Sequence, residues 1–158
     1  MDLEVQEQDH EKVRIIPGTR DHVSQANFLI QEFCKESLEE YGLVFSEPAV
    51  NAAVDLFIDY SFVCFVGDKL VGLIAGQVTT QVVTGNKMFQ EQMWFVSKPY
   101  RKYGIKLLKA METRCLDEGI KTLVLAFMGN SKPEKLERFY LNLGYRFMEA
   151  HYVKTFPS

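Results

Sequence analysis

The sequence lacks the features that mark membrane, secreted or metal-binding proteins. No apolar run reaches the roughly 18 residues that a membrane-spanning helix needs. Residues 1–12 are acidic and polar, without the apolar core of a signal peptide. The histidines His10, His22 and His151 have no metal-ligand spacing, and no clustered Asp/Glu array is present. We therefore expect a cytoplasmic protein that uses no metal and binds no membrane.

Cysteine is also scarce. Cys34, Cys64 and Cys115 are odd in number, widely spaced and surrounded by apolar residues. This pattern argues against a disulfide framework and against a Cys-x-x-Cys metal site. We expect three reduced thiols in the core, where apolar surroundings disfavour the reactive thiolate.

An excess of positive charge is absent as well. The formal net charge is −3, whereas a protein that binds nucleic acid normally presents a basic surface. Residues 98–106 form a local basic patch. Neither a Gly-x-x-x-x-Gly-Lys-Ser/Thr loop nor a Gly-x-Gly-x-x-Gly loop is present, which disfavours nucleotide-binding domains of those kinds. We expect no nucleic acid partner.

The composition that remains is typical of one soluble globular domain. The 158 residues are 47% hydrophobic and 25% charged. A chain of this length buries about 70% of its unfolded surface, which is enough for a full core. Residues 1–12 have no apolar periodicity and are predicted to form a flexible tail, whereas residues 13–158 are predicted to form a single domain.

The apolar pattern predicts a mixed α/β (α+β) fold. Gly67 and Asp68 link two strand patterns as a two-residue hairpin turn. Residues 122–127 are the most uniformly apolar stretch, as expected of a central strand covered on both faces. We expect a mostly antiparallel twisted sheet with helices on both faces. The predicted strands are 13–16, 62–66, 69–80, 87–96, 122–127 and 145–156, and the predicted helices are 21–41, 47–58, 104–117 and 134–143.

Residues 91–108 organise the rest of the chain. An aromatic and β-branched strand ends at Pro99, and a basic turn holding Gly104 leads into a helix. Such a unit leaves unpaired N–H groups and the positive end of a helix dipole beside basic side chains. It therefore predicts a site for phosphate or pyrophosphate.

The same residues resemble the acetyl-coenzyme A signature of the GNAT (Gcn5-related) N-acetyltransferases, Gln/Arg-x-x-Gly-x-Gly/Ala. Lys106 stands where the family has glycine or alanine, which lets the backbone approach the pyrophosphate closely. The Lys106 ammonium would pair with a phosphate, or its bulk would block this approach. The order of elements also agrees with GNAT folds from Val13 onward. The resemblance implies a V-shaped splay between strands four and five that holds the pantetheine of acetyl-CoA. The matching stretch is Arg101-Lys102-Tyr103-Gly104-Ile105-Lys106.

The resemblance also implies roles for individual residues. The thioester carbonyl would lie along Phe95 and Val96. Tyr140 matches the tyrosine of the family's Phe-Tyr-x-x-x-Gly-Phe/Tyr signature, which protonates the departing thiolate. Glu91 matches a strand-four glutamate that serves as the general base, and Asn130 matches an asparagine that contacts the pantetheine. Packing, surface exposure and loop capping are the alternatives for Tyr140, Glu91 and Asn130 respectively, and Glu149 and His151 are less favoured bases.

The resemblance implies acetyl transfer to a primary amine. The apolar settings of the cysteines favour direct transfer in a ternary complex, without a covalent intermediate on cysteine. Lys106 and the distance from Asn130 to Tyr140 also fit an alternative, a GNAT-fold module that binds coenzyme A or a protein without catalysis. The acceptor, a small-molecule amine or a protein amine, does not follow from the sequence. Exposed strand edges are compatible with a homodimer.

Overall fold

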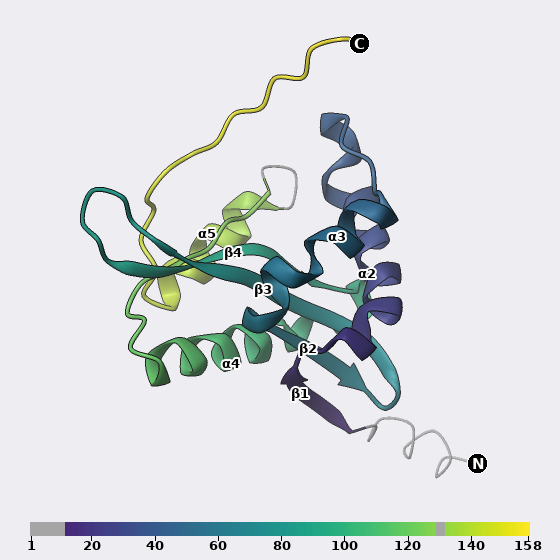
Figure 1. The fold of residues 1–158 in the computed structure, drawn as a ribbon, viewed down its shortest axis with the longest axis horizontal. Coiled ribbons are helices and arrows are strands. Elements are labelled where there is room, and N and C mark those ends of the chain that lie inside the picture. The colour runs from purple at the N-terminus through teal and green to yellow at the C-terminus, as the bar shows by residue number, and fades with distance from the viewer. Residues whose placement is uncertain (1–11, 129–131) are drawn as a thin grey trace.

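The computed structural model of the chain describes residues 12–128 and 132–158. Within these residues a five-stranded sheet has the order β1-β2-β3-β4-β5. Figure 1 shows β1 to β4 in this sheet. The first four strands are antiparallel to their neighbours, and β5 is parallel to β4. All but Lys12 of the predicted tail lies outside the described residues. The strands are β1 (Val13–Pro17), β2 (Ser61–Val66), β3 (Lys69–Thr80), β4 (Lys87–Val96) and β5 (Leu123–Val124).

Turn and cap residues place these elements as their chemistry requires. Gly67 joins β2 to β3 with φ at 58°, the left-handed conformation that a tight hairpin turn demands, so the predicted hairpin is confirmed. Ser46 caps the helix that begins at Glu47, because its Oγ accepts a hydrogen bond from the N–H of Ala49 at 3.3 Å. The helices are α2 (Val23–Ser37), α3 (Glu47–Phe57), α4 (Gly104–Asp117) and α5 (Pro133–Asn142).

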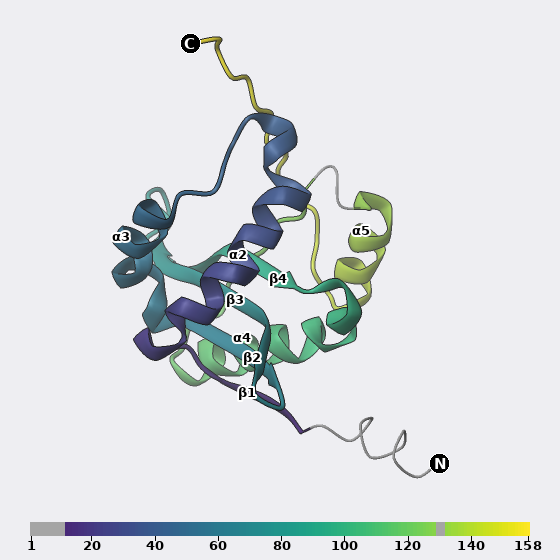
Figure 2. The same cartoon turned by 90° about the vertical axis from the view of Figure 1, so that its right-hand side faces the viewer.

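Helices cover both faces of the sheet, as predicted. Strand alternation sends Val63 and Phe65 of β2 into a cluster with Leu29 of α2. Cys64 and Val66 point to the opposite face and pack in a cluster with the buried residues of α4. In Figure 2, α5 stands apart from α2 and α3, on the other side of β4. None of the helices in the described residues is long and apolar enough to cross a membrane.

A bulge interrupts β4 in the middle of the strand. Ala75 pairs with Met93 and Gly76 pairs with Glu91, so Gln92 is left without a partner on β3. The backbones approach closely there, because a Cβ at Gly76 would lie 2.2 Å from the carbonyl oxygen of Gln90. The extra residue reverses the alternation of side chains after the bulge. Side chains in the second half of β4 therefore point to the opposite faces from those that a regular strand would give.

The second half of β4 has no strand neighbour on its β5 side within the described residues. Pairing with β5 is confined to Phe89 with Leu123 and Gln90 with Val124. From Glu91 onward the two strands separate, and this is the V-shaped splay that the family resemblance predicted.

The prediction of a central strand over residues 122–127 was wrong. Only Leu123 and Val124 are in a strand, and they lie at the edge of the sheet. The pairing ends because the chain leaves β4 at the splay. The apolar side chains beyond it pack on other elements, as Phe127 does by stacking on Tyr140 with ring centroids 6.2 Å apart. Their hydrophobicity therefore reflects helix contacts rather than a position between two strands.

The predicted closing strands over residues 145–156 are also absent. This segment has no strand pairing, and its side chains beyond Tyr145 are exposed; Tyr152, for example, is 96% exposed. Apolar and β-branched residues form a strand only where a neighbouring strand offers hydrogen bonds, and β5 is too short to do so. One side-chain contact holds the far end, because Thr155 Oγ1 donates to the carbonyl oxygen of Tyr41 at 3.2 Å.

Candidate functional site

The splay brings the predicted acid and the predicted base to the same residue, Ala126. The N–H of Ala126 donates to Glu91 Oε2 at 3.4 Å, and the hydroxyl of Tyr140 donates to the Ala126 carbonyl oxygen at 2.9 Å. Glu91 comes from β4 just before the bulge, whereas Tyr140 comes from the buried face of α5. Two residues that are distant in sequence therefore contact the same residue beside the splay.

The surroundings change how both groups titrate. Burial raises the pKa of Glu91 from its ordinary 4.5 to about 7, and the hydrogen bond from Ala126 opposes part of that rise. Burial, followed by the charges of Glu91 and Tyr145, raises the pKa of Tyr140 well above its ordinary value. Near neutral pH Glu91 can therefore take up or release a proton, and Tyr140 keeps its proton available for donation.

The end of β4 directs the backbone N–H of Val96 toward the splay. Ser97 N–H donates to the carbonyl oxygen of Val71 on β3 at 2.8 Å. Because N–H directions alternate along an antiparallel strand, the N–H of Val96 points away from β3, on the side of the splay. The N–H of Phe95 points the other way, toward β3. The Phe95 ring lies against α2, and its centroid is 5.5 Å from that of the Phe33 ring. Phe95 and Val96 were both predicted to lie along the thioester carbonyl. Of these two residues, Val96 is the one whose N–H points toward the splay.

The predicted anion-binding turn follows directly. It is the 3₁₀ helix η5 (Lys98–Tyr103), and α4 begins at Gly104. Lys102 Nζ and Lys106 Nζ lie 5.2 and 6.0 Å from the ring centroid of Tyr103, so both cations gather at the start of α4. Lys106 is exposed, while Ile105 is half-buried. The side chain of Lys106 therefore extends the basic surface of the turn.

Gly104 has room around it in this structure. Its φ of −57° is helical, and an added Cβ would meet Val96 Cγ2 at 3.6 Å and the indole of Trp94 at 3.8 Å, which are ordinary contacts. The fold itself therefore does not require glycine here. A ligand between α4 and β4 would require glycine here, because a Cβ would occupy part of its space.

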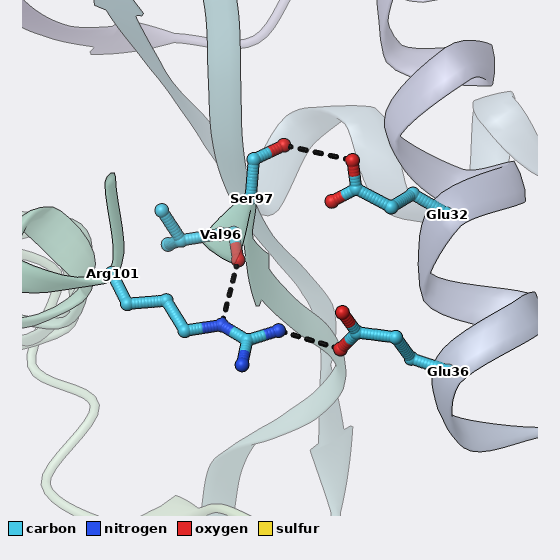
Figure 3. Close-up of polar contacts among 5 residues, drawn as sticks. All are labelled: Glu32, Glu36, Val96, Ser97 and Arg101. Atoms are coloured by element: carbon cyan, nitrogen blue, oxygen red, sulfur yellow. Dashed lines mark hydrogen bonds and ion pairs between the residues drawn. The ribbon is translucent and has the colours of Figure 1, made fainter. Parts of the chain in front are cut away.

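Arg101 contacts protein groups rather than facing solvent alone (Figure 3). Its Nε donates to the carbonyl oxygen of Val96 at 3.2 Å, and its Nη2 lies 2.5 Å from Glu36 Oε2 on α2. Beside it, Ser97 Oγ donates to Glu32 Oε1 at 3.2 Å. These contacts tie α2 to the end of β4 and to the turn. A phosphate contact by Arg101 stays a prediction.

Sequence reasoning missed Glu32, Ser97 and Trp94. Glu32 and Glu36 are four residues apart and so share one helix face, which was the available signal for a contact between α2 and β4. Trp94 was treated only as part of the strand pattern, although its Nε1–H donates to the Gly104 carbonyl oxygen at 3.2 Å. The predicted contact Asn130 lies outside the described residues.

A family model described as "Acetyltransferase (GNAT) domain" matches residues 29–156. The chain belongs to the GNAT acetyltransferase family. It is therefore an acyltransferase of the GNAT type, and the family uses acetyl-CoA. No curated protein matches the chain.

Solved structures share the GNAT fold at low sequence identity. A ribosomal-protein-alanine N-acetyltransferase from Brucella melitensis biovar Abortus 2308 is 18% identical, with a TM-score of 0.71 over 91% of this chain and 99% of that one. An aminoglycoside acetyltransferase from an uncultured soil metagenomic sample is 15% identical, with a TM-score of 0.70 over 92% and 99%. AAC(6')-Iy, solved with the bisubstrate analogue CoA-S-monomethyl-acetylneamine, is 13% identical, with a TM-score of 0.69 over 93% and 99%.

The GNAT assignment gives the splay its place in the fold. The two strands that separate at Glu91 are β4 and β5, and the turn that follows β4 holds the stretch that resembles the family signature, with Lys106 at its last position. Among residues 12–128 and 132–158, no group of three or more His, Cys, Asp or Glu side chains is placed to hold a metal ion. Beside this splay, Glu91 and Tyr140 are two titratable side chains that both contact Ala126.

Proposed function

We propose that this protein transfers the acetyl group of acetyl-CoA directly to a primary amine in a ternary complex, and that residues 13–158 form one acetyltransferase domain. The observation that carries the proposal is the pair formed by Glu91 and Tyr140, which reach Ala126 from two elements and meet at the splay. Their titration suits opposite tasks, since Glu91 exchanges a proton near neutral pH and Tyr140 retains one.

The residues of the turn and strand fit acetyl-CoA as a co-substrate. The exposed cations Lys102 and Lys106 lie beside the N-terminus of α4, where a pyrophosphate would be favoured. Gly104 has no Cβ to narrow the space between α4 and Val96. Acetyl-CoA would supply the activated acetyl thioester, and the Val96 N–H would stabilise negative charge that develops on the thioester oxygen.

Proton transfers complete the proposed mechanism. An amine attacks only when it is neutral, so Glu91 Oε2 would accept the proton of an ammonium acceptor, directly or through a water molecule. The hydroxyl of Tyr140 would give its proton to the departing sulfur and recover one afterwards. Direct transfer needs no cysteine, and Cys34, Cys64 and Cys115 are buried, with burial raising the pKa of each thiol.

The acceptor is proposed only as a primary amine, on a small molecule or on a protein. The acidic side chains of α2 and α3 are partly committed within the chain, because Glu36 pairs with Arg101 and Asp55 pairs with Arg20. Glu47 lines a surface hollow of about 290 Å³ together with Asn27 and other residues of α2. These contacts do not distinguish a small amine from a protein amine.

The proposal is tested with the double variant Glu91→Gln/Tyr140→Phe. Acetyl-CoA binding is measured by calorimetry, and turnover is measured against spermidine, kanamycin and lysine-containing peptides. We expect the variant to bind acetyl-CoA as the wild type does and to lose turnover by at least about 100-fold. Equal turnover by the variant and the wild type would remove both residues from the mechanism. Wild-type protein that binds acetyl-CoA but acetylates none of these amines would instead favour the binding module.

We also propose a homodimer. The tip of the β3–β4 hairpin exposes Val82 and Val83 by 94% and 84%, and Gln81 Oε1 fixes the tip by accepting hydrogen bonds from Val83 N–H and Thr84 N–H at 2.7 and 2.8 Å. An ordered loop that presents two apolar side chains suits a protein contact. In sedimentation equilibrium, the wild type should have the mass of a dimer, and Val82→Asp/Val83→Asp should have the mass of a monomer. A monomeric wild type would refute this.

A further inference from the structure

Trp94 occupies the junction between the turn that would bind phosphate and the proposed general acid. It is the only tryptophan in the chain. Its Nε1–H donates to the Gly104 carbonyl oxygen at 3.2 Å, which joins β4 to the first residue of α4. Its ring lies with its centroid 6.0 Å from that of Tyr140, at an interplanar angle of 37°. One side chain therefore contacts both halves of the site.

The bond from Trp94 to Gly104 links the second half of β4 to the start of α4. The 3₁₀ helix η5 carries the chain away from Val96 and back to Gly104. The pantetheine arm has a limited reach, so the start of α4 and the Val96 N–H must lie within that reach for both to engage one ligand. The indole N–H adds a direct hydrogen bond across that separation.

The bond adds little to the stability of the fold. The Gly104 carbonyl is the first of α4 and has a second partner available in the helix, the N–H four residues later. Removing the indole N–H therefore leaves no buried acceptor without a donor, and the cost to folding stays small. A bond of this kind contributes mainly to the alignment of the site.

The ring of Trp94 supports Tyr140. Phe127 stacks on Tyr140 with centroids 6.2 Å apart, and the Trp94 ring lies 6.0 Å away. Packing by these rings restricts the rotation of Tyr140, whose hydroxyl is directed at the Ala126 carbonyl oxygen.

We propose that Trp94 is a positioning residue that couples the phosphate-binding turn to Tyr140, and so determines how tightly the thiol end of the coenzyme is held. This inference rests on the proposed function. It assigns Trp94 no contact with a reacting atom, because the residue acts through Gly104 and through the Tyr140 ring.

The test is a double-mutant cycle with Trp94→Phe and Tyr140→Phe, read by calorimetric titration with acetyl-CoA and with coenzyme A. Trp94→Phe keeps an apolar ring and removes the N–H, and we expect it to weaken binding of both ligands by about fivefold. Tyr140→Phe should weaken coenzyme A by about threefold. If the residues are coupled, the double variant should lose about fivefold for coenzyme A, whereas independent effects would multiply to about fifteenfold.

Phe139→Leu is the matched control. Phe139 touches the same two rings, with centroids 6.3 Å from Trp94 and 6.2 Å from Tyr140, and it has no bond to the turn. We expect it to keep acetyl-CoA affinity within about twofold. Urea unfolding of all variants separates packing from positioning, since Trp94→Phe should change affinity with little change in stability.

The outcomes separate the inference from the function on which it rests. Wild type that binds neither ligand would refute the proposed function and the inference together. Wild type that binds, with Trp94→Phe of equal affinity or with losses that multiply in the double variant, would overturn the inference alone. Binding that leaves the tryptophan emission of the wild type unchanged would also count against it.

Discussion

Replacing Glu91 with glutamine should stabilise the protein while it removes activity. Burial raises the pKa of Glu91 from 4.5 to about 7, so the folded state holds this proton more tightly than the unfolded chain. At a pH between these two values the folded state binds more protons, and stability falls as the pH rises. Above the folded pKa the full penalty of the buried charge is present.

The size of the effect follows from the shift. A pKa that rises from 4.5 to about 7 corresponds to about 3 kcal/mol of destabilisation once Glu91 is ionised. Glutamine is neutral at every pH and can still accept the Ala126 N–H bond. The free energy of unfolding of Glu91→Gln should therefore exceed that of the wild type by under about 1 kcal/mol near pH 5 and by about 3 kcal/mol near pH 8.

Urea denaturation of both proteins at the two pH values measures this difference. Glu137→Gln, at an exposed position of α5, is the control and should show no such growth with pH. The kcat/KM of the wild type should rise with a midpoint near pH 7, and the variant should lack this limb because its side chain takes up no proton. If the free energy of unfolding of Glu91→Gln exceeded that of the wild type by the same amount at both pH values, the raised pKa of a buried Glu91 carboxyl would be wrong.

Three further substitutions test other parts of the site. Tyr140→Phe keeps the ring contacts but loses the bond to Ala126, so turnover should fall about 100-fold with a stability loss of about 1 kcal/mol; an unchanged kcat would exclude the acid role. Gly76→Ala would place a Cβ 2.2 Å from a backbone carbonyl, and unfolding by urea should show a loss of about 3 kcal/mol, whereas wild-type stability would contradict the bulge. Gly104→Ala should gain about 0.5 kcal/mol and bind acetyl-CoA at least about tenfold more weakly by calorimetry; full affinity would mean that no ligand passes there.

Local signals predicted the framework of the fold well, because each depends on a few neighbouring residues. The Gly67 turn fixes the β2–β3 hairpin, and Ser46 begins α3 as a cap. The bulge in β4 was not predicted, since the strand pattern around Gln92 has no local mark. Its cause lies across the sheet at Gly76, where the absence of a Cβ admits the close approach.

The errors came from reading strand propensity without a partner strand. Residues 145–156 have the residue types of a strand, yet the edge at β5 is two residues long and offers no ladder to extend. The contact between Arg101 and Glu36 depends in the same way on tertiary structure, since α2 must first pack on β4. Glu91 and Tyr140 were predicted through the family resemblance, and the structure adds their common partner, Ala126.

Binding of acetyl-CoA at the turn is tested by calorimetric titration of the wild type beside Lys102→Glu/Lys106→Glu and the control Lys109→Glu. All three lysines are exposed, so the folds should be retained, and Lys109 lies about one turn further along α4. We expect one-site binding by the wild type and the control, and at least about tenfold weaker binding by the double variant. No binding by the wild type, or equal affinity in all three proteins, would contradict binding at the turn.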